Sequence, residues 1–129
     1  MADTRLRSPL GRVMGLGSAK EGVAHWWAQR MTALALIPLA IWLIATIMAV
    51  MVSPYAEAVA YLRRPFNAVF MALLVAATFH HGQLGLQVVI EDYVHTEATK
   101  VALLLLVKAL AVVLAALGIL AVLKLALGG

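Results

Sequence analysis

Two adjacent histidines, His80 and His81, lie within an apolar stretch that carries no formal charge and is long enough to cross a membrane. Ionisable or ligating side chains are costly inside a bilayer, which makes both residues candidates for function. Because neighbouring residues of a helix point about 100° apart, the two imidazoles cannot face the same partner. The chain has no Cys, which excludes thiolate metal sites and iron–sulfur clusters held by this chain and leaves histidine as the candidate metal ligand.

Gly85 follows His81 by four residues and therefore lies on nearly the same side of a helix. A histidine ligand with a glycine one turn away leaves space for a flat, bulky group, and haem is such a group. A six-coordinate haem would need a second ligand. Another chain would supply it, because His25 and His95 both lie near a membrane interface. The alternative is a buried pair of histidines that only form hydrogen bonds with neighbouring helices.

Three polar residues, Glu91, Asp92 and Tyr93, close the same stretch. Tyr93 follows His81 by twelve residues, or about 18 Å along a helix. A phenol beside a carboxylate at the membrane boundary can hydrogen-bond the carbonyl of a membrane-soluble quinone and exchange a proton with it. The alternative is an ordinary helix end with an interfacial tyrosine, although carboxylates at a helix C-terminus oppose the helix dipole.

An aromatic and basic group, Trp26, Trp27 and Arg30, precedes the first apolar run. A guanidinium binds carboxylates in bidentate geometry, so Arg30 could pair with an anionic cofactor group such as a haem propionate. A plain role as a positive anchor at the membrane surface is equally consistent with its position. The two tryptophans suit the level of the lipid headgroups.

The composition excludes an ordinary soluble protein, because 64% of the 129 residues are hydrophobic, 12% are charged and the mean hydropathy is +0.98. A chain of this length has room for three membrane crossings and none for a soluble catalytic domain. Any enzyme activity must therefore be shared with other chains, and no catalytic residue is expected on this chain alone. The net charge of +4 comes mainly from the first thirty residues, which favours a membrane-orientation signal over a nucleic-acid site.

The apolar runs predict an all-α membrane protein with three transmembrane helices in a single domain. The expected layout is an N-terminal segment over residues 1–25 and spans over residues 26–53, 66–92 and 100–127. Short connections make successive spans antiparallel neighbours, and Pro38 should kink the first span. Lys108 and Lys124 interrupt an otherwise apolar third span, and their long side chains can reach an interface.

Basic residues are distributed unequally between the two ends of this predicted bundle. The N-terminal segment and the second connection carry six cations, and three lie at the opposite end: Arg5, Arg7, Arg12, Lys20, Arg30 and Lys100 against Arg63, Arg64 and Lys124. The positive-inside rule then places the N-terminus in the cytoplasm and the C-terminus on the far side of the membrane.

Two stretches, SAKEGVAHWWAQRMTALALIPL at residues 18–39 and HHGQLGLQVVIEDYVH at residues 80–95, resemble the hydrophobic membrane anchor (D) subunits of succinate dehydrogenase, respiratory complex II, of the alphaproteobacterial type. The resemblance implies that three spans form half of a two-subunit anchor bundle in the bacterial inner membrane, with the C-terminus in the periplasm. The implied partners are a second anchor of the cytochrome b556 type (the C subunit), the iron–sulfur subunit, the flavoprotein subunit and membrane lipid. No nucleic acid is implied.

The same resemblance implies electron transfer from succinate to ubiquinone, within the respiratory chain and the tricarboxylic acid cycle, with haem b shared between the two anchors. His81 matches the axial haem ligand, Tyr93 matches the tyrosine that hydrogen-bonds the quinone, and Asp92 matches its acidic neighbour. Arg30 is similar to the family's arginine near the start of the first span, within reach of the quinone site or of a haem propionate.

The choice of His81 over His80 depends on register. Gly85 stands four residues after His81, whereas His80 would place Leu84 in the glycine position, so His80 is the fallback ligand. Two other functions stay open at this point. One is a haem-free structural anchor of a related fumarate reductase-type complex. The other, a small transporter or proton channel, is disfavoured because the third span offers no polar partner and the chain has no broken-helix repeat.

Overall fold

The computed structural model describes residues 20–128, with side chains described from residue 22 onward. It contains four helices, labelled α2 (Lys20–Met51), α3 (Tyr55–Leu62), α4 (Pro65–Tyr93) and α5 (Glu97–Leu127). No β-strand occurs within this described range. Most of the predicted N-terminal segment, residues 1–25, lies outside it, and so do the basic residues Arg5, Arg7 and Arg12.

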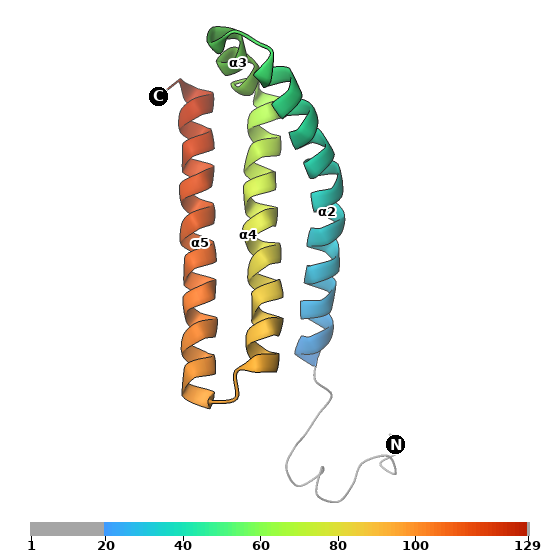
Figure 1. Cartoon of the computed structure of the whole chain (residues 1–129), viewed down its shortest axis with the longest axis vertical. Helices are drawn as coiled ribbons and strands as arrows, with labels where there is room; N and C mark the ends of the chain where they lie inside the picture. The colour runs from blue at the N-terminus through green and yellow to red at the C-terminus, as the bar shows by residue number, and fades with distance from the viewer. Residues whose placement is uncertain (1–19, 129) are drawn as a thin grey trace, which may run out of the picture.

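The three long helices lie side by side, with α4 in the middle, α2 on one side and α5 on the other (Figure 1). The beginning of α2 and the connection between α4 and α5 lie at one end of the molecule, while α3 and the end of α5 lie at the other. Each of the three helices is long and apolar enough to cross a membrane. The predicted all-α fold with three transmembrane helices is therefore confirmed.

Prolines and a glycine set several of the helix boundaries. Pro65 occupies the first turn of α4, where its missing N–H leaves no bond unmade, and Gly128 ends α5 with a left-handed φ of 83°. The sequence predicts only a connection between the first two spans, from Pro54 to Pro65, but the structure has the eight-residue helix α3 between these prolines. Pro38 lies inside α2, which continues through it and is visibly bowed (Figure 1).

The packing of the helices depends on small and polar residues, as expected where lipid is as apolar as the side chains. A Cβ added at Gly118 of α5 would lie 2.7 Å from Val75 Cγ1 of α4, so the glycine permits the close approach of these two helices. Asn67, only 4% exposed, donates from Nδ2 to the Tyr61 carbonyl at 2.7 Å and so fixes the turn from α3 into α4.

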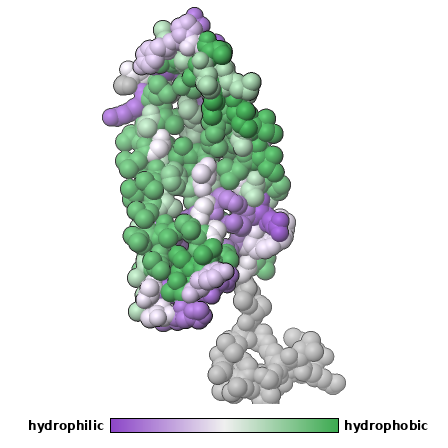
Figure 2. Space-filling view, in the orientation of Figure 1, coloured by the Kyte–Doolittle hydropathy of each residue, from purple (hydrophilic) through white to green (hydrophobic). Residues whose placement is uncertain are grey.

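Large apolar side chains cover most of the outer surface, as a lipid-facing protein requires. Figure 2 shows this surface interrupted by a hydrophilic patch over the lower half of α2 and toward α4. On this face of the molecule, the hydrophilic patch therefore lies over the two helices that carry the candidate site residues.

Candidate functional site

His81 lies on the side of α4 that faces α2. Its Nδ1 is 3.0 Å from Oγ1 of Thr32, a residue 49 positions earlier in the chain. One turn further along α4, a Cβ added at Gly85 would lie 3.7 Å from Nε2 of Gln29. The pair that sequence analysis placed on one side of this helix is thus packed against α2, and both residues are half-buried.

A polar stripe on α2 meets these residues. His25, Gln29 and Thr32 are spaced by four and three residues, so they share one side of the helix. His25 Nε2 and Gln29 Oε1 are buried and have no hydrogen-bond partner in the described part of the chain. Gln29 and Thr32 were not among the site residues predicted from the sequence. The signal was available in this helical spacing at the start of an apolar run.

The adjacent His80 has a different environment. Its side chain is exposed, and it lines a groove of about 360 Å³ together with Gln83 of α4 and Lys108 of α5. Further along the same side of α4, Gln83 Nε2 donates to Gln87 Oε1 at 3.3 Å, and Gln87 Nε2 donates to Glu91 Oε1 at 2.8 Å. The two histidines therefore belong to two separate polar surfaces of one helix.

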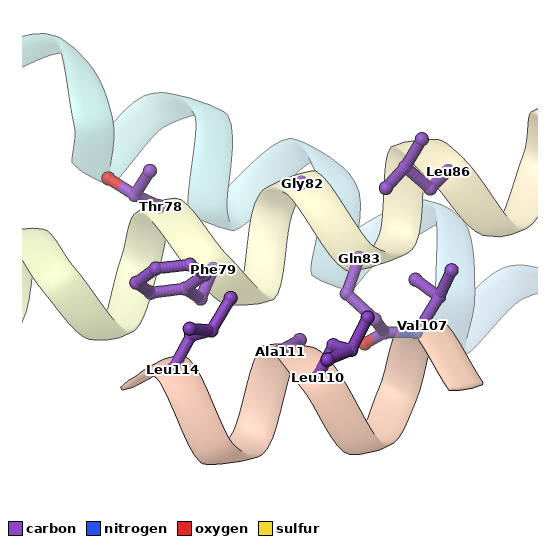
Figure 3. Close-up of a pocket in the computed structure, with 9 residues that line it drawn as sticks. All are labelled: Thr78, Phe79, Gly82, Gln83, Leu86, Val107, Leu110, Ala111 and Leu114. Carbon is purple, nitrogen blue, oxygen red and sulfur yellow. The ribbon is translucent and has the colours of Figure 1, made fainter. Parts of the chain in front are cut away.

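A second groove, of about 380 Å³, lies between α4 and α5 (Figure 3). Phe79 and Gln83 of α4 point toward α5 in this view. The lining residues are mostly apolar and include no ionisable group: Thr78, Phe79, Gly82, Gln83, Leu86, Val107, Leu110, Ala111 and Leu114. A Cβ added at Gly82 would meet nothing within 4 Å. Gly82 thus opens onto this groove, in contrast to Gly85, which packs against α2.

The acidic and phenolic residues lie at the end of α4. Tyr93 is the last residue of the helix and is 78% exposed, and Asp92 beside it is also exposed. This end of α4 lies at the same end of the molecule as the beginning of α2 (Figure 1). A ligand could therefore approach the Tyr93 hydroxyl without displacing any described part of the chain.

Arg30 is exposed on α2, and its guanidinium carbon lies 5.3 Å from the centre of the Trp26 ring. Such a cation–π contact holds the side chain while leaving its N–H groups available. Trp26 in turn meets the Trp27 ring edge-on, with the ring centres 5.1 Å apart. Trp26 therefore contacts the arginine directly, and Trp27 packs behind Trp26.

The position of Arg30 along the bundle can be read from the pairing of α2 with α4. Because Thr32 lies opposite His81 and Gln29 lies opposite Gly85, residue 30 lies at the level of residues 83–84. That level is about 4 Å along the helix axis from His81 and about 14 Å from Tyr93. Within this chain, Arg30 is therefore closer to the level of the histidine than to that of the tyrosine.

In the described part of the chain, no three His, Asp or Glu side chains come together to hold a metal ion. A porphyrin iron needs only its axial ligands from protein, and these can come from separate chains. His81 is the histidine best placed for such a role, because it lies within a membrane span beside a glycine and its Nδ1 already has a partner.

Comparison with known proteins gives consistent results. Residues 4–118 match the family described as succinate dehydrogenase/fumarate reductase transmembrane subunit. The succinate dehydrogenase hydrophobic membrane anchor subunit of Rickettsia bellii is 34% identical over 102 residues, which cover 79% of this chain and 82% of the relative. The same subunit of Paracoccus denitrificans is 35% identical over 101 residues, 78% of each chain. The succinate dehydrogenase membrane anchor subunit of Reclinomonas americana is 31% identical over 97 residues, 72% of this chain and 80% of the relative.

Proposed function

Because the chain belongs to the succinate dehydrogenase/fumarate reductase transmembrane subunit family, we propose that it is an anchor that supplies one axial ligand of haem b and part of a ubiquinone-reduction site. The observation that carries this proposal is the setting of His81 within a membrane span, hydrogen-bonded through Nδ1 and beside Gly85. The chain has no activity alone. It acts as one subunit of succinate:ubiquinone oxidoreductase, in electron transport and the tricarboxylic acid cycle.

The residues around His81 fit a haem. The imidazole provides a nitrogen ligand, Gly85 adds no side chain beside it, and the buried His25 Nε2 and Gln29 Oε1 have no hydrogen-bond partner among the described residues. When bound, haem supplies a one-electron redox centre within the membrane. Arg30 would hold a propionate, because a guanidinium pairs well with carboxylate and this residue lies near the level of His81.

A second protein ligand for the haem would come from a partner chain. The pairing of α2 with α4 puts His25 opposite residues 88–89, about 11 Å along the axis from His81, so these two histidines would not hold the same haem. His80 lies on another side of α4, and His95 lies beyond the end of that helix. A second three-helix anchor is the partner that the family suggests, and the two chains together form the anchor bundle.

Ubiquinone binds at the end of α4. The Tyr93 hydroxyl donates a hydrogen bond to a quinone carbonyl oxygen, which draws electron density toward that oxygen as electrons arrive from the iron–sulfur subunit. The exposed Asp92 carboxylate exchanges protons with water at the membrane surface and so replaces the protons that the quinone takes up.

The orientation that agrees with this chemistry has the start of α2 and the end of α4 on the cytoplasmic side of a bacterial inner membrane. The positive-inside count supports it. The flavoprotein and iron–sulfur subunits dock at this end, where electrons must leave a soluble enzyme for a membrane-bound quinone. The C-terminus then lies in the periplasm.

The test uses the whole complex purified from its membrane, with Tyr93→Phe compared with the native chain. Loss of the phenolic donor should reduce succinate:ubiquinone turnover by about 100-fold. Succinate oxidation by an artificial soluble acceptor should be unchanged, because that assay does not use the membrane site.

The matched control is Tyr55→Phe, which changes another exposed tyrosine at the opposite end of the molecule and should leave both assays unchanged. Unchanged quinone turnover in Tyr93→Phe would remove the quinone site from this residue. A reduced-minus-oxidised optical spectrum of the same native complex tests the haem, since absence of a b-type band would favour the haem-free structural anchor.

A further inference from the structure

On the basis of the proposed function, we propose that Thr32 is a positioning residue for the haem ligand: its hydroxyl accepts a hydrogen bond from Nδ1–H of His81, which fixes the tautomer that presents the Nε2 lone pair to iron. Thr32 lies on α2 and His81 on α4, so the ligand of one helix is oriented by another helix of the same chain.

The direction of this hydrogen bond follows from counting protons. Thr32 Oγ1 lies 2.7 Å from the Ala28 carbonyl oxygen and 3.1 Å from that of Gln29. A hydroxyl has one proton and two lone pairs, and neither carbonyl oxygen can donate. The proton must therefore point toward the backbone, because otherwise two oxygens would lie 2.7 Å apart with no hydrogen between them. Bonding of this kind, to the carbonyl four residues earlier, is common for threonine in helices.

The oxygen of Thr32 is then left with only lone pairs to offer to His81. The contact at 3.0 Å is consequently a bond in which Nδ1–H donates and Oγ1 accepts. In a neutral imidazole only one nitrogen carries a proton, so Nε2 is the nitrogen with a free lone pair. No hydrogen bond to His81 Nε2 is found among the described residues, which leaves that atom available for a ligand bond.

The same bond also orients the ring and tunes it electronically. Threonine is branched at Cβ and its hydroxyl is held by the backbone, so its oxygen occupies a fixed place on α2. A histidine that donates its second ring N–H in this way is a stronger ligand, and loss of such a partner typically weakens metal binding by about 10-fold to 100-fold. A stronger donor stabilises ferric over ferrous iron and lowers the midpoint potential of the haem.

The test compares three variants within the purified complex: Thr32→Val, which keeps the shape but removes the hydroxyl, Thr32→Ser, which keeps the hydroxyl, and the control Thr46→Val. Thr46 is a second buried threonine of α2, and its Oγ1 has no hydrogen-bond partner in the described chain. The measured quantities are haem content per complex, the haem midpoint potential and the electron paramagnetic resonance spectrum of the ferric haem.

We expect Thr32→Val to raise the haem midpoint potential, change the ferric spectrum and weaken haem retention by about 10-fold or more. Thr32→Ser should restore native values, and Thr46→Val should not differ from native. A native potential and spectrum in Thr32→Val would overturn the inference. If the Thr32→Val complex does not assemble, the same three quantities are measured for Thr32→Ala, and native values in that variant would likewise overturn the inference.

Failure of this inference can be told apart from failure of the proposed function. If His81→Ala loses the haem while Thr32→Val keeps a native potential, the ligand is confirmed and Thr32 has no positioning role. If His81→Ala keeps the native haem spectrum, the proposed ligand is wrong, and the inference about Thr32 is overturned with it.

Discussion

His80 and His81 are neighbours in sequence, yet the structure gives them contrasting surroundings. His81 is half-buried between α4 and α2 and hydrogen-bonded to Thr32, while His80 is exposed beside a groove that includes Gln83 and Lys108. The step of about 100° between adjacent helical residues is enough to separate them. One imidazole therefore has the fixed position that a metal ligand needs, and the other does not.

The two surfaces of α4 also satisfy their polar groups in different ways. On the His81 side, polar atoms are bonded between helices or remain unpaired and buried, as at Gln29. On the His80 side, Gln83, Gln87 and Glu91 bond to one another along the helix. Hydrogen bonds thus satisfy the polar side chains of one surface within α4, whereas the other surface has buried polar atoms without a partner among the described residues.

The largest effect should come from removing each histidine in turn. His81→Ala should abolish the b-type band in a reduced-minus-oxidised spectrum of the purified complex, because the iron loses an axial ligand. His80→Ala should leave at least most of the band, since its exposed ring makes no hydrogen bond to a described residue. The opposite result, a band lost only in His80→Ala, would move the ligand to His80 and reverse the comparison.

A smaller effect, on haem occupancy, should distinguish alanine substitutions of the two glycines on α4, Gly82 and Gly85. Neither Gly85→Ala nor Gly82→Ala brings the new methyl group closer than 3.7 Å to this chain, and alanine favours a helix by about 1 kcal/mol. Both variants should therefore fold. Only Gly85→Ala should lower haem occupancy, because only that methyl group intrudes on the His81 side.

Haem content per complex, measured by the pyridine haemochrome assay, decides this prediction. Equal occupancy in the two variants would show that Gly85 leaves no space that the haem uses. A loss confined to Gly82→Ala would place the macrocycle over the groove between α4 and α5 instead.

The fold and the position of the main candidate residues were predictable from sequence because they depend on local patterns. Three long apolar runs fix three membrane helices, and a glycine four residues after His81 fixes a shared side of α4. The short helix α3 was missed because two prolines so close together suggest a plain connection, although its eight residues can form two helical turns.

The partners of His81 could not be predicted, because they depend on how two helices are aligned. Thr32 is separated from His81 by 49 residues, and a shift of α2 by one residue would bring a different side chain opposite the imidazole. The alignment follows from packing along the whole length of both helices. Spacing within one helix identifies which of its residues lie on the same side. It does not identify which residue of the neighbouring helix contacts them.

The smallest effect should come from removing the hydrogen bonds that connect Gln83, Gln87 and Glu91 on the His80 side of α4. Gln87→Leu removes the middle of the Gln83–Gln87–Glu91 series, whose bonds connect residues of one helix and are worth about 0.2–0.5 kcal/mol each. Thermal denaturation of the purified complex should shift only slightly, with native haem content and quinone turnover, since none of these groups contacts the His81 side. Asn67→Leu is the useful contrast: it removes a buried bond between α4 and α3 and should destabilise more. A Gln87→Leu complex that failed to assemble would instead identify this surface of α4 as the one covered by a partner subunit.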